Sequence, residues 1–552
     1  MATSDIQQPG WHWRIWPWQR TAAADVQLPA LAEYRSLKRN RLRNSLGIGA
    51  LMLFCLIYGF FFSAFVPSYF AFFMLPLAFL GLLVIWVLPD LNWAPTKTLE
   101  WLLLATMVAL VAWPDYLALS LPGLPWITLL RLTSFPTTLV LLICLSMSTT
   151  FREQMVRTVN VIPSISILLA IFAGVQFVSI AFSAEISSSL QKFIIDQVVW
   201  TAMFFAGTYV FLRPGMIRRW SLILWALAIY VALISILEYR VGHILWAGHI
   251  PSFLKVEDES VERVLAGSMR AGTNRYRAQA TFGTPLGLAE YIALALPFVL
   301  HFMTKRFPAK MRIAAFCSVP LLLFSVYLTD AKLGTIGCLL DILLYIFVVA
   351  FENWRRNKSS LVAASILYAC PFGILVVMAA VVLNQRLHVM ILGGSSHSFS
   401  TDSRLAQYTL GMGKMLEWPF GYGVGQSGTT LGFATEGQSM ITVDTYYLTV
   451  LLEYGFAGFI AYFGMFLIAA YEGAKRILVS PLVNEDRSFL IPITVSLTSF
   501  IVIKSVFSQQ DNHPIVFMIL GALVALAASQ RAAARKALRT ARPVAGVQPR
   551  LA

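Results

Sequence analysis

The chain has 552 residues, of which 58% are hydrophobic and only 12% are charged, and its formal net charge is +15. Soluble domains carry roughly 25% charged residues, so this chain lacks the polar surface that a protein of its size needs in water. The composition excludes a water-soluble globular protein and predicts a polytopic membrane protein. We assign much of the positive charge to short basic loops and tails, and we expect no nucleic-acid partner.

The hydrophobic runs predict an all-α membrane helix bundle of about fourteen transmembrane helices, because a span needs roughly 17–25 apolar residues. The polar first 44 residues hold no apolar signal-peptide stretch, so the first span is expected to direct insertion. The expected spans cover residues 45–66, 70–88, 99–113, 127–148, 162–182, 193–212, 220–238, 285–303, 313–329, 333–350, 361–383, 445–470, 489–507 and 514–529.

The orientation of the spans follows from lysine and arginine in the connections. RPGMIRRW, TKRFPAKMR, ENWRRNK and YEGAKR recur at every second connection, and basic segments begin and end the chain. Basic residues favour the cytoplasmic side, so these connections and both tails are expected in the cytoplasm. Two long connections are then left on the outer side, and long loops on a compact scaffold are often functional.

This topology divides the chain into segments, and we expect the function to reside mainly in the second long loop. The segments are a cytoplasmic basic N-terminal segment 1–44, transmembrane helices 45–238, an outer loop with an arginine cluster 239–284, transmembrane helices 285–383, a large outer catalytic loop 384–444, transmembrane helices 445–529 and a cytoplasmic basic tail 530–552.

Three arginines gather near the end of the first outer loop, where Arg270, Arg275 and Arg277 fall within eight residues. The positive-inside rule disfavours such a cluster outside, so we expect it to bind an anionic partner. Guanidinium suits phosphate because its rigid fork offers two hydrogen bonds and its charge does not titrate away. The alternative is a solvated, partly self-neutralised loop, since acidic residues lie just upstream at Glu257, Asp258, Glu259 and Glu262.

The second outer loop holds a helix-like stretch and a glycine-rich one. SRLAQYTLGMGKML has the spacing of an amphipathic helix, which Arg404 is expected to open. PFGYGVGQSG follows, and its glycines allow a close backbone approach to a ligand, with Tyr422 and Gln426 as expected substrate contacts. The stretch does not match the GxxxxGK[ST] pattern of a nucleotide-binding loop.

Asp444 stands at the mouth of an expected span, directly after the large loop. Helical spacing places it on one face with Tyr447, Leu448 and Leu451, and we expect Tyr447 to contact the substrate as well. A structural reading is that Asp444 is a helix N-cap, because Asp satisfies orphan backbone N–H groups there.

Other ionisable residues fall within the expected spans or at their edges. Asp341 lies in the middle of a span with Lys332 about two turns earlier, and Glu290, Glu453 and Lys504 lie in three further spans. Such residues are expensive in a bilayer and are usually functional. We expect these mainly as internal ion pairs or cavity-lining groups.

Three stretches, taken in order, make the chain resemble the bacterial O-antigen ligase and Wzy-type polysaccharide polymerase superfamily. They are RYRAQATFGTPLGLAEYIALALP (275–297), SRLAQYTLGMGKMLEWPFGYGVGQS (403–427) and VDTYYLTVLLEYGFAG (443–458). A weaker match is LTDAKLG (328–334), where Lys332 stands at the position of a family arginine. The matches lie within roughly residues 275–460, about a third of the chain. Ala280 stands where the family often has glycine.

The resemblance implies a metal-independent glycosyltransferase without a cofactor, in the bacterial inner membrane, with its active site facing the periplasm. Its substrates would be sugars on undecaprenyl diphosphate, and Arg277 and Arg404 would engage the lipid diphosphate. Family ligases carry a histidine where this chain has Asp444, followed by the same spacing to Gly455. That departure favours the polymerase branch, which makes O-antigen or exopolysaccharide.

The chemistry of such a reaction gives Asp444 a second reading. Fixed cations can stabilise the charge that develops on a diphosphate leaving group without a metal ion. The acceptor hydroxyl must lose a proton, and a partly desolvated carboxylate can act as the general base, which is worth roughly 10²–10⁴ in rate. We therefore expect Asp444, Arg277 and Arg404 as catalytic residues, and Arg270 and Arg275 as substrate-binding residues.

Two alternatives stay open at this point. One is a ligase that moves finished glycan to lipid A core or to protein, and the other is a flippase for lipid-linked oligosaccharide. Transporters usually show pseudo-symmetric repeats and short outer loops, whereas this chain shows no repeat and two long loops. The expected partners are membrane lipid and the lipid-linked oligosaccharide, with a chain-length co-polymerase implied only by analogy with the pathway.

Overall fold

The computed structural model describes residues 53, 76–77, 79–90, 93–120, 126–270, 275–383, 398–432, 443–479 and 485–541. The chain divides into two units, Met1–Leu75 and Pro76–Ala552, and only Leu53 of the first is described. The expected cytoplasmic segment 1–44 therefore lies outside the described residues, as does the first expected span apart from Leu53.

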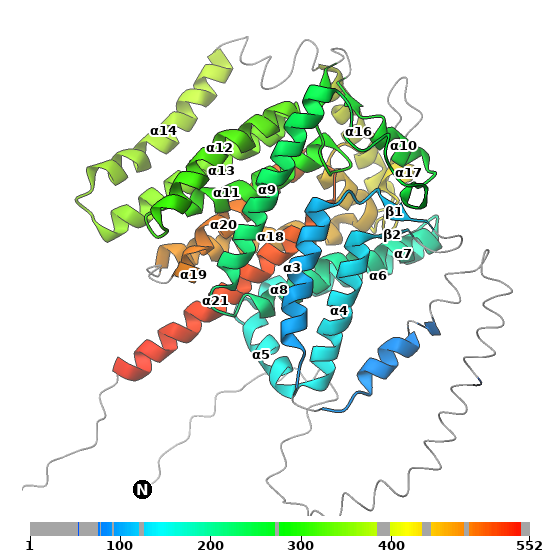
Figure 1. Ribbon diagram of the computed structural model, residues 1–552, viewed down its shortest axis with the longest axis horizontal. Helices are drawn as coiled ribbons and strands as arrows, with labels where there is room; N and C mark the ends of the chain where they lie inside the picture. The colour runs from blue at the N-terminus through cyan, green and yellow to red at the C-terminus, as the bar shows by residue number, and fades with distance from the viewer. Residues whose placement is uncertain are drawn as a thin grey trace, which may run out of the picture. The chain divides into compact units, whose positions relative to one another are not determined.

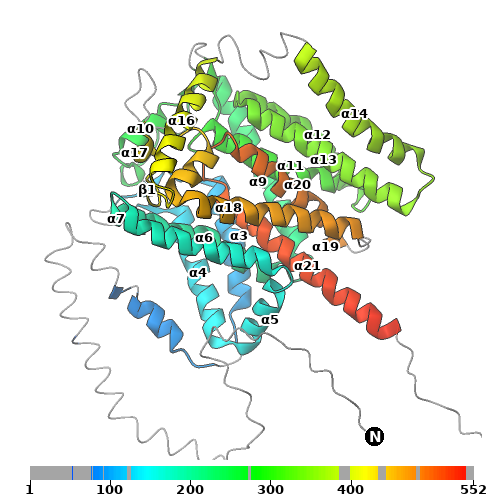
Figure 2. The same ribbon diagram turned by 180° about the vertical axis from the view of Figure 1, so that it is seen from behind.

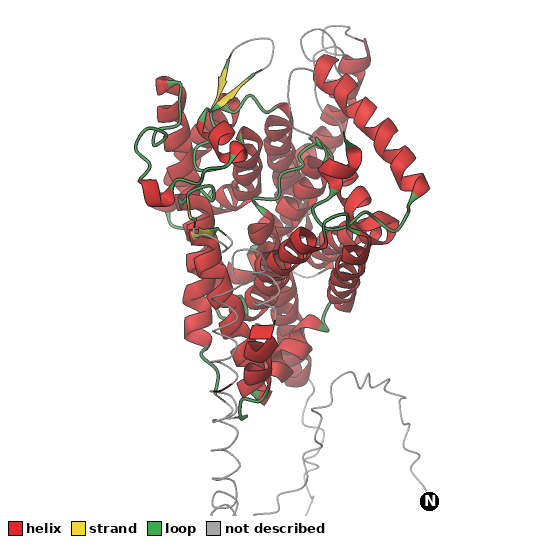
Figure 3. Cartoon of the chain, turned by 90° about the vertical axis from the view of Figure 1, so that its right-hand side faces the viewer, coloured by secondary structure: helices red, strands yellow, loops and turns green. Residues whose placement is uncertain are grey.

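The second unit is built almost entirely of helices (Figures 1 and 3). Two antiparallel pairs of two-residue strands are present, β1 with β2 and β3 with β4, in which Ala118 lies opposite Thr128 and Ser268 opposite Arg277. In chain order the elements are α3 Thr96–Ala112, β1 Ala118–Leu119, β2 Ile127–Thr128, α4 Leu129–Met147, α5 Thr149–Val159, α6 Pro163–Ser179, η1 Ile180–Phe182, α7 Ile186–Asp196, the π-helical η2 Gln197–Thr201, α8 Ala202–Val210, α9 Met216–Val241, η3 Ser252–Leu254, α10 Glu259–Leu265, β3 Ser268–Met269, β4 Tyr276–Arg277, α11 Pro285–Phe302, α12 Ala309–Leu328, α13 Lys332–Arg356, α14 Leu361–Leu383, α16 Ser398–Glu417, α17 Ser427–Leu431, α18 Tyr446–Val479, α19 Glu485–Ser488, α20 Leu490–Lys504 and α21 His513–Ala541.

Among the described residues, ten helical segments are long and apolar enough to cross a membrane. The prediction of a multi-pass, all-α membrane protein is thus confirmed, while the count of about fourteen spans stays a prediction. The expected span 99–113 falls in α3, which has 17 residues, and the last helix runs to Ala541, beyond the expected end of its span at 529. The ten segments are Leu129–Met147, Pro163–Phe182, Ile186–Val210, Met216–Val241, Pro285–Phe302, Ala309–Leu328, Lys332–Arg356, Tyr446–Val479, Glu485–Lys504 and His513–Ala534.

Helix α11 forms the centre of this bundle. Its start is fixed locally, because the Thr284 hydroxyl accepts a hydrogen bond from the Gly287 N–H at 3.1 Å and Pro285 occupies the first helical position. Of the membrane-spanning stretch of α11, 89% is buried, compared with 22% for α4. Helix α11 is therefore surrounded by protein, whereas much of the surface of α4 is free to contact lipid. It packs against α9, α12, α13 and α20, and α14 packs on α13 (Figures 1 and 2).

Basic connections gather at one end of the bundle. Arg218 at the start of α9 pairs with Glu485, just before α20, at 3.2 Å. Arg306, after α11, pairs with Glu352 near the end of α13 at 2.8 Å. We call this end, where α9 and α20 begin and α11 and α13 end, the basic end. The opposite end, where α11, α13 and α18 begin, is called the loop end.

Candidate functional site at the loop end

The segments that carry the expected site residues meet at the loop end. The ring of Tyr446, at the start of α18, lies 5.2 Å from the Lys504 ammonium at the end of α20. Lys504 pairs at 2.7 Å with Glu290, in the second turn of α11. The neighbouring Ala289 packs against Gly334, near the start of α13. Residues far apart in the sequence are thereby held at the same end of the bundle.

The first group at this end is a cation cluster, which we define as Arg270, Arg277 and Lys332 around Asp330. The Arg277 Nε donates a hydrogen bond to the Thr329 carbonyl at 2.9 Å. The Arg270 Nη1 donates to the carbonyl and to the carboxylate of Asp330, at 2.8 and 2.9 Å. Burial and then the nearby Arg270 charge lower the pKa of Arg277, while Asp330 raises it. The charges of Arg270 and Asp330 also act on Lys332. Three cations facing one carboxylate leave an excess of positive charge that suits an anion.

Backbone strain coincides with this cluster. Ala280 and Asp330, with φ of 51° and 48°, are the non-glycine residues of positive φ among those the structure describes. Their segments are joined directly, because the Ala278 N–H donates to the Leu328 carbonyl at 3.1 Å. Strained residues tend to cluster at functional sites, where the surroundings over-determine them. The left-handed conformation of Ala280 also explains why glycine would suit this position.

Arg275 takes a different place from the other two loop arginines. Its guanidinium lies 4.9 Å from the centre of the Tyr327 ring, and its Nε donates to the Tyr239 hydroxyl at 3.3 Å. Cation–π contact of this kind holds the side chain against the ends of α9 and α12. Its expected role in substrate binding stays a prediction.

The second group joins the large loop to α18. The Asp444 carboxylate accepts a hydrogen bond from Gln407 Nε2 at 3.3 Å, and the Asp444 N–H donates to Gln407 Oε1 at 2.9 Å. Arg404 lies one turn earlier on α16, close enough for its charge to act on Asp444. The Arg404 Nε is buried and has no hydrogen-bond partner among the described residues. The sequence predicted that Arg404 begins this helix. Because α16 begins at Ser398, Arg404 lies inside the helix instead.

The surroundings of Asp444 disfavour its charged form. Burial raises the pKa of Asp444, and the Arg404 charge and the Gln407 hydrogen bond lower it to a smaller extent. Because α18 begins at Tyr446, Asp444 stands two residues before the helix and not within it. The hydrogen bond described for its carboxylate goes to α16 and not to the first turn of α18. This geometry does not match an N-cap, and the role of Asp444 as a proton acceptor stays a prediction.

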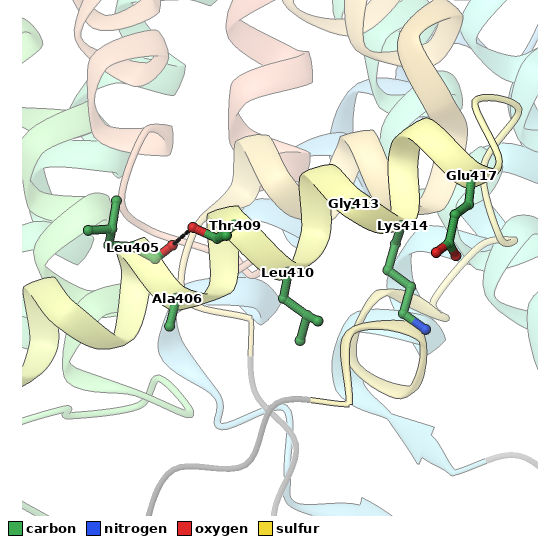
Figure 4. Close-up of a pocket in the computed structure, with 7 residues that line it drawn as sticks. All are labelled: Leu405, Ala406, Thr409, Leu410, Gly413, Lys414 and Glu417. Atoms are coloured by element: carbon green, nitrogen blue, oxygen red, sulfur yellow. Dashed lines mark hydrogen bonds between the residues drawn. The ribbon is translucent and has the colours of Figure 1, made fainter.

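A groove lies against α16, and Figure 4 labels the residues of this helix that line it. It has a volume of about 680 Å³ and is lined by Leu405, Ala406, Thr409, Leu410, Gly413, Lys414 and Glu417. The hydroxyl of Thr409 is occupied, because it donates to the Leu405 carbonyl at 2.9 Å. Most of the surface that lines the groove is apolar. Gln407, on the same helix, is buried and bonds Asp444. Helix α16 therefore has the Asp444 group on one face and an open apolar groove on another.

The glycine-rich stretch packs against protein backbone. Helix α18 is interrupted at Gly455, which has φ 66° and ψ −171°, so the preceding carbonyls lose their helical donors. The N–H groups of Tyr422 and Gly423 replace those donors on Leu452 and Glu453, at 2.8 and 3.2 Å. The close backbone approach that the sequence predicted for a ligand is made in this structure to α18.

The polar side chains expected to contact substrate all have protein partners. The Tyr422 hydroxyl donates to the Lys414 carbonyl at 2.8 Å, and the Tyr447 hydroxyl donates to the Ile501 carbonyl at 2.8 Å. Gln426 is buried, and its amide donates to the Ser188 hydroxyl at 3.3 Å. These bonds fix the loop and the start of α18, and substrate binding by the three residues stays a prediction.

The ionisable residues within the spans differ in their partners. Glu290 and Lys504 form a fully buried ion pair, and Glu453 lies 3.7 Å from Lys192, as expected of internal ion pairs. Asp341 is fully buried, and the Ser499 hydroxyl is a polar group that acts on its carboxylate. Lys332 belongs to the cation cluster at the start of α13.

The structure places four of the eight expected site residues in these two groups, Arg270 and Arg277 in the first and Arg404 and Asp444 in the second. It adds Gln407 and Asp330, which the sequence analysis missed. Gln407 could have been found from its spacing of three residues from Arg404, which places both on one helical face. Asp330 gave no such signal, because its role depends on a turn between two helices. No group of three or more His, Cys, Asp or Glu side chains that could hold a metal ion occurs in the described part of the chain.

Comparison with known proteins identified no relative of this chain. No protein-family model matches the chain, and a search of curated proteins found no match.

Proposed function

We propose that the chain is a bacterial inner-membrane polysaccharide polymerase of the O-antigen or exopolysaccharide type. It transfers a growing glycan from undecaprenyl diphosphate to a lipid-linked repeat unit on the periplasmic side. The observation that carries this proposal is that a half-buried carboxylate, Asp444, is hydrogen-bonded to Gln407 of α16 and lies within reach of the Arg404 charge, at the same end of the bundle as the cation cluster.

The roles follow from the chemistry of glycosyl transfer. An acceptor hydroxyl attacks the anomeric carbon, a new C–O bond forms and the bond to the lipid diphosphate breaks. Asp444 takes the hydroxyl proton, and the negative charge on the departing diphosphate is stabilised by Arg277 and Arg404. A single displacement of this kind inverts the anomeric centre. No metal ion or cofactor is assigned to any step.

The distribution of charge supports the proposed orientation. The basic connections lie at the end opposite to Asp444, and the positive-inside rule assigns that end to the cytoplasm. The loop end then faces the periplasm, where nucleotide sugars are absent and a lipid diphosphate supplies an already activated donor. The lipid-linked oligosaccharide is the proposed substrate, and a chain-length co-polymerase remains a partner by analogy only.

The proposal predicts that Asp444→Asn and Arg277→Ala each abolish long polymer, because one removes the proton acceptor and the other a cation at the leaving group. The measurement is the length distribution of surface glycan in cells that produce each variant, with the amount of protein in the membrane determined in parallel. Glu259→Gln, at a side chain of α10 that is 77% exposed, is the matched control and should leave polymer length unchanged. Normal polymer length in both site variants would refute the assigned roles.

Product analysis separates polymerase from ligase. A deletion strain of a polymerase retains single repeat units and loses long chains, whereas a ligase uses an acceptor other than another repeat unit. The presence of Asp444 in place of the ligase histidine favours the polymerase.

A transporter is a second candidate, favoured by the buried Glu290–Lys504 pair and by Asp341, since intramembrane ionisable residues often mark transport pathways. In reconstituted vesicles a polymerase makes polymer from substrate presented on its loop side without any flipping. A transporter moves the substrate across the bilayer and makes no polymer.

A further inference from the structure

We propose that Glu238 is a positioning residue that holds Arg277 in place for the lipid diphosphate, an inference that rests on the proposed function. Glu238 lies near the end of α9 and is only 1% exposed. Its described hydrogen bonds go to none of Asp444, Arg277 and Arg404, and nothing in the sequence motifs singles it out. Its contacts, however, lie on both sides of Arg277.

The Glu238 carboxylate receives three hydrogen bonds from the segment that carries Arg277. The Tyr276 hydroxyl donates to Oε1 at 2.7 Å. On the other side of Arg277, the backbone N–H of Gln279 donates to Oε1 at 3.1 Å and that of Ala280 donates to Oε2 at 2.6 Å. One buried carboxylate therefore fixes the chain immediately before and shortly after the arginine.

The hydrogen bond from the Ala280 N–H to Glu238 explains how Ala280 is held in a strained backbone conformation. Ala280 has a φ of 51°, a conformation that residues other than glycine adopt at a penalty. Its N–H is buried, and without Glu238 Oε2 it would lose the partner described here. The carboxylate thus stabilises a turn that would otherwise relax. A relaxed turn would move Arg277, two residues before Gln279, away from Thr329 and the rest of the cation cluster.

The charge of Glu238 matters as well as its shape. A carboxylate accepts with both oxygens, and hydrogen bonds to a charged acceptor are shorter and stronger than neutral ones. Glutamine in the same rotamer could accept with one oxygen only and would turn an N–H₂ group toward one of the donors. Glu238→Gln therefore removes at least one of the three bonds while it preserves the volume of the side chain.

The test measures binding of geranylgeranyl diphosphate, a short prenyl diphosphate, to the purified full-length protein in detergent. We expect Arg277→Ala and Glu238→Gln each to weaken binding by at least about tenfold, because small misplacements of a charged group have large effects. In the Arg277→Ala background, Glu238→Gln should weaken binding no further, since Glu238 acts through Arg277. Glu259→Gln is the control and should bind as the unmodified protein does.

A purely structural role for Glu238 gives a different pattern. It would weaken binding by the same factor with or without Arg277, and that additivity would overturn the inference, as would unchanged binding in Glu238→Gln. Should Glu238→Gln fail to fold, Tyr276→Phe removes one donor and keeps the ring, and the same non-additive result is expected with a smaller loss. Adding Ala280→Gly to Glu238→Gln should restore part of the binding, because glycine adopts the turn without the clamp.

Failure of the proposed function looks different again. If Arg277→Ala binds the prenyl diphosphate as well as the unmodified protein does, the role given to Arg277 is wrong. If Arg277→Ala binds weakly but Glu238→Gln binds normally, the proposed function stands and only the positioning role of Glu238 falls.

Discussion

At the scale of single residues, Asp444 and Glu238 show how surroundings assign different tasks to the same functional group. Glu238 is buried and accepts three hydrogen bonds, so it is suited to hold a segment in place. Asp444 is half-buried and accepts one described hydrogen bond, from Gln407. Burial raises the pKa of Asp444, and a carboxyl with a raised pKa is the better proton acceptor.

The pKa of Asp444 gives a prediction about pH. Asp444 can accept a proton only when it is ionised, so activity should be present above its pKa and fall as the pH drops through it. The Gln407 hydrogen bond lowers that pKa, so Gln407→Met should raise it further and move the acid limb of the activity profile to higher pH. The measurement is the rate of polymer formation by purified protein as a function of pH.

Thr409→Val, on the groove side of α16, is the matched control for this experiment and should leave the acid limb where it is. Identical acid limbs for Gln407→Met and the unmodified protein would show that another group governs the pH dependence.

At the scale of elements, the interruption of α18 explains the glycine-rich stretch. A break at Gly455 leaves helix carbonyls without donors, and the loop that contains Tyr422 and Gly423 supplies them. Gly421 packs so closely that a Cβ there would lie 2.5 Å from the Glu453 carbonyl oxygen. The large loop and α18 therefore interlock through backbone contacts, and this fixes the end of α16 relative to the residues that follow Asp444.

The interlock predicts that Gly455→Ala destabilises the protein. The φ and ψ of Gly455 lie in a region that is essentially restricted to glycine, and an added Cβ would lie 2.1 Å from the Pro419 carbonyl oxygen. We expect a loss of at least about 2 kcal/mol, seen as a lower melting temperature in detergent and less protein in the membrane.

Gly464→Ala is the matched control, because Gly464 lies in the same helix and a Cβ there would make an ordinary contact at 3.6 Å with Leu168. That variant should melt close to the unmodified protein. Equal melting temperatures for Gly455→Ala and the unmodified protein would mean that the interlock adds no stability.

At the scale of the whole molecule, the two ends of the bundle differ in the charged groups that they carry. Ion pairs between helix ends hold the basic end together, and the loop end holds the cation cluster and Asp444. Helix α5 lies near the basic end, because Phe151 contacts the ring of Tyr209, at the end of α8, at 4.2 Å. Helix α10 belongs to the connection between α9 and α11 at the loop end.

This separation predicts the sidedness of labelling by a membrane-impermeant maleimide. Cysteines introduced singly as Glu259→Cys and Arg157→Cys occupy positions whose native side chains are 77% and 79% exposed. In a chain whose own cysteines are replaced by serine, Glu259→Cys should be labelled in cells with a permeable outer membrane. Arg157→Cys should be labelled only after the inner membrane is opened, and the reverse pattern would contradict the proposed orientation.

Much of the fold and part of the site could be predicted from local patterns. The apolar runs located most of the described spans, and the amphipathic spacing of SRLAQYTLGMGKML anticipated α16, although not its start at Ser398. The penalty of isolated charges in a bilayer predicted internal ion pairs or cavity-lining groups, whereas the pairing of Glu290 with Lys504 came from the structure. The place of Lys332, the donor role of Gln407 and the interruption at Gly455 were not predicted, because each depends on a partner segment far away in the chain.

The sequence by itself determined that this is a multi-pass helical membrane protein, because apolar content and span length depend only on local composition. It also picked out the arginines and Asp444, since charged residues beside apolar runs are conspicuous. Only the tertiary structure decided that Arg270, Arg277 and Lys332 share one cluster and that Gln407 joins α16 to Asp444. These associations arise from packing between helices, which the periodicity of any single segment does not encode.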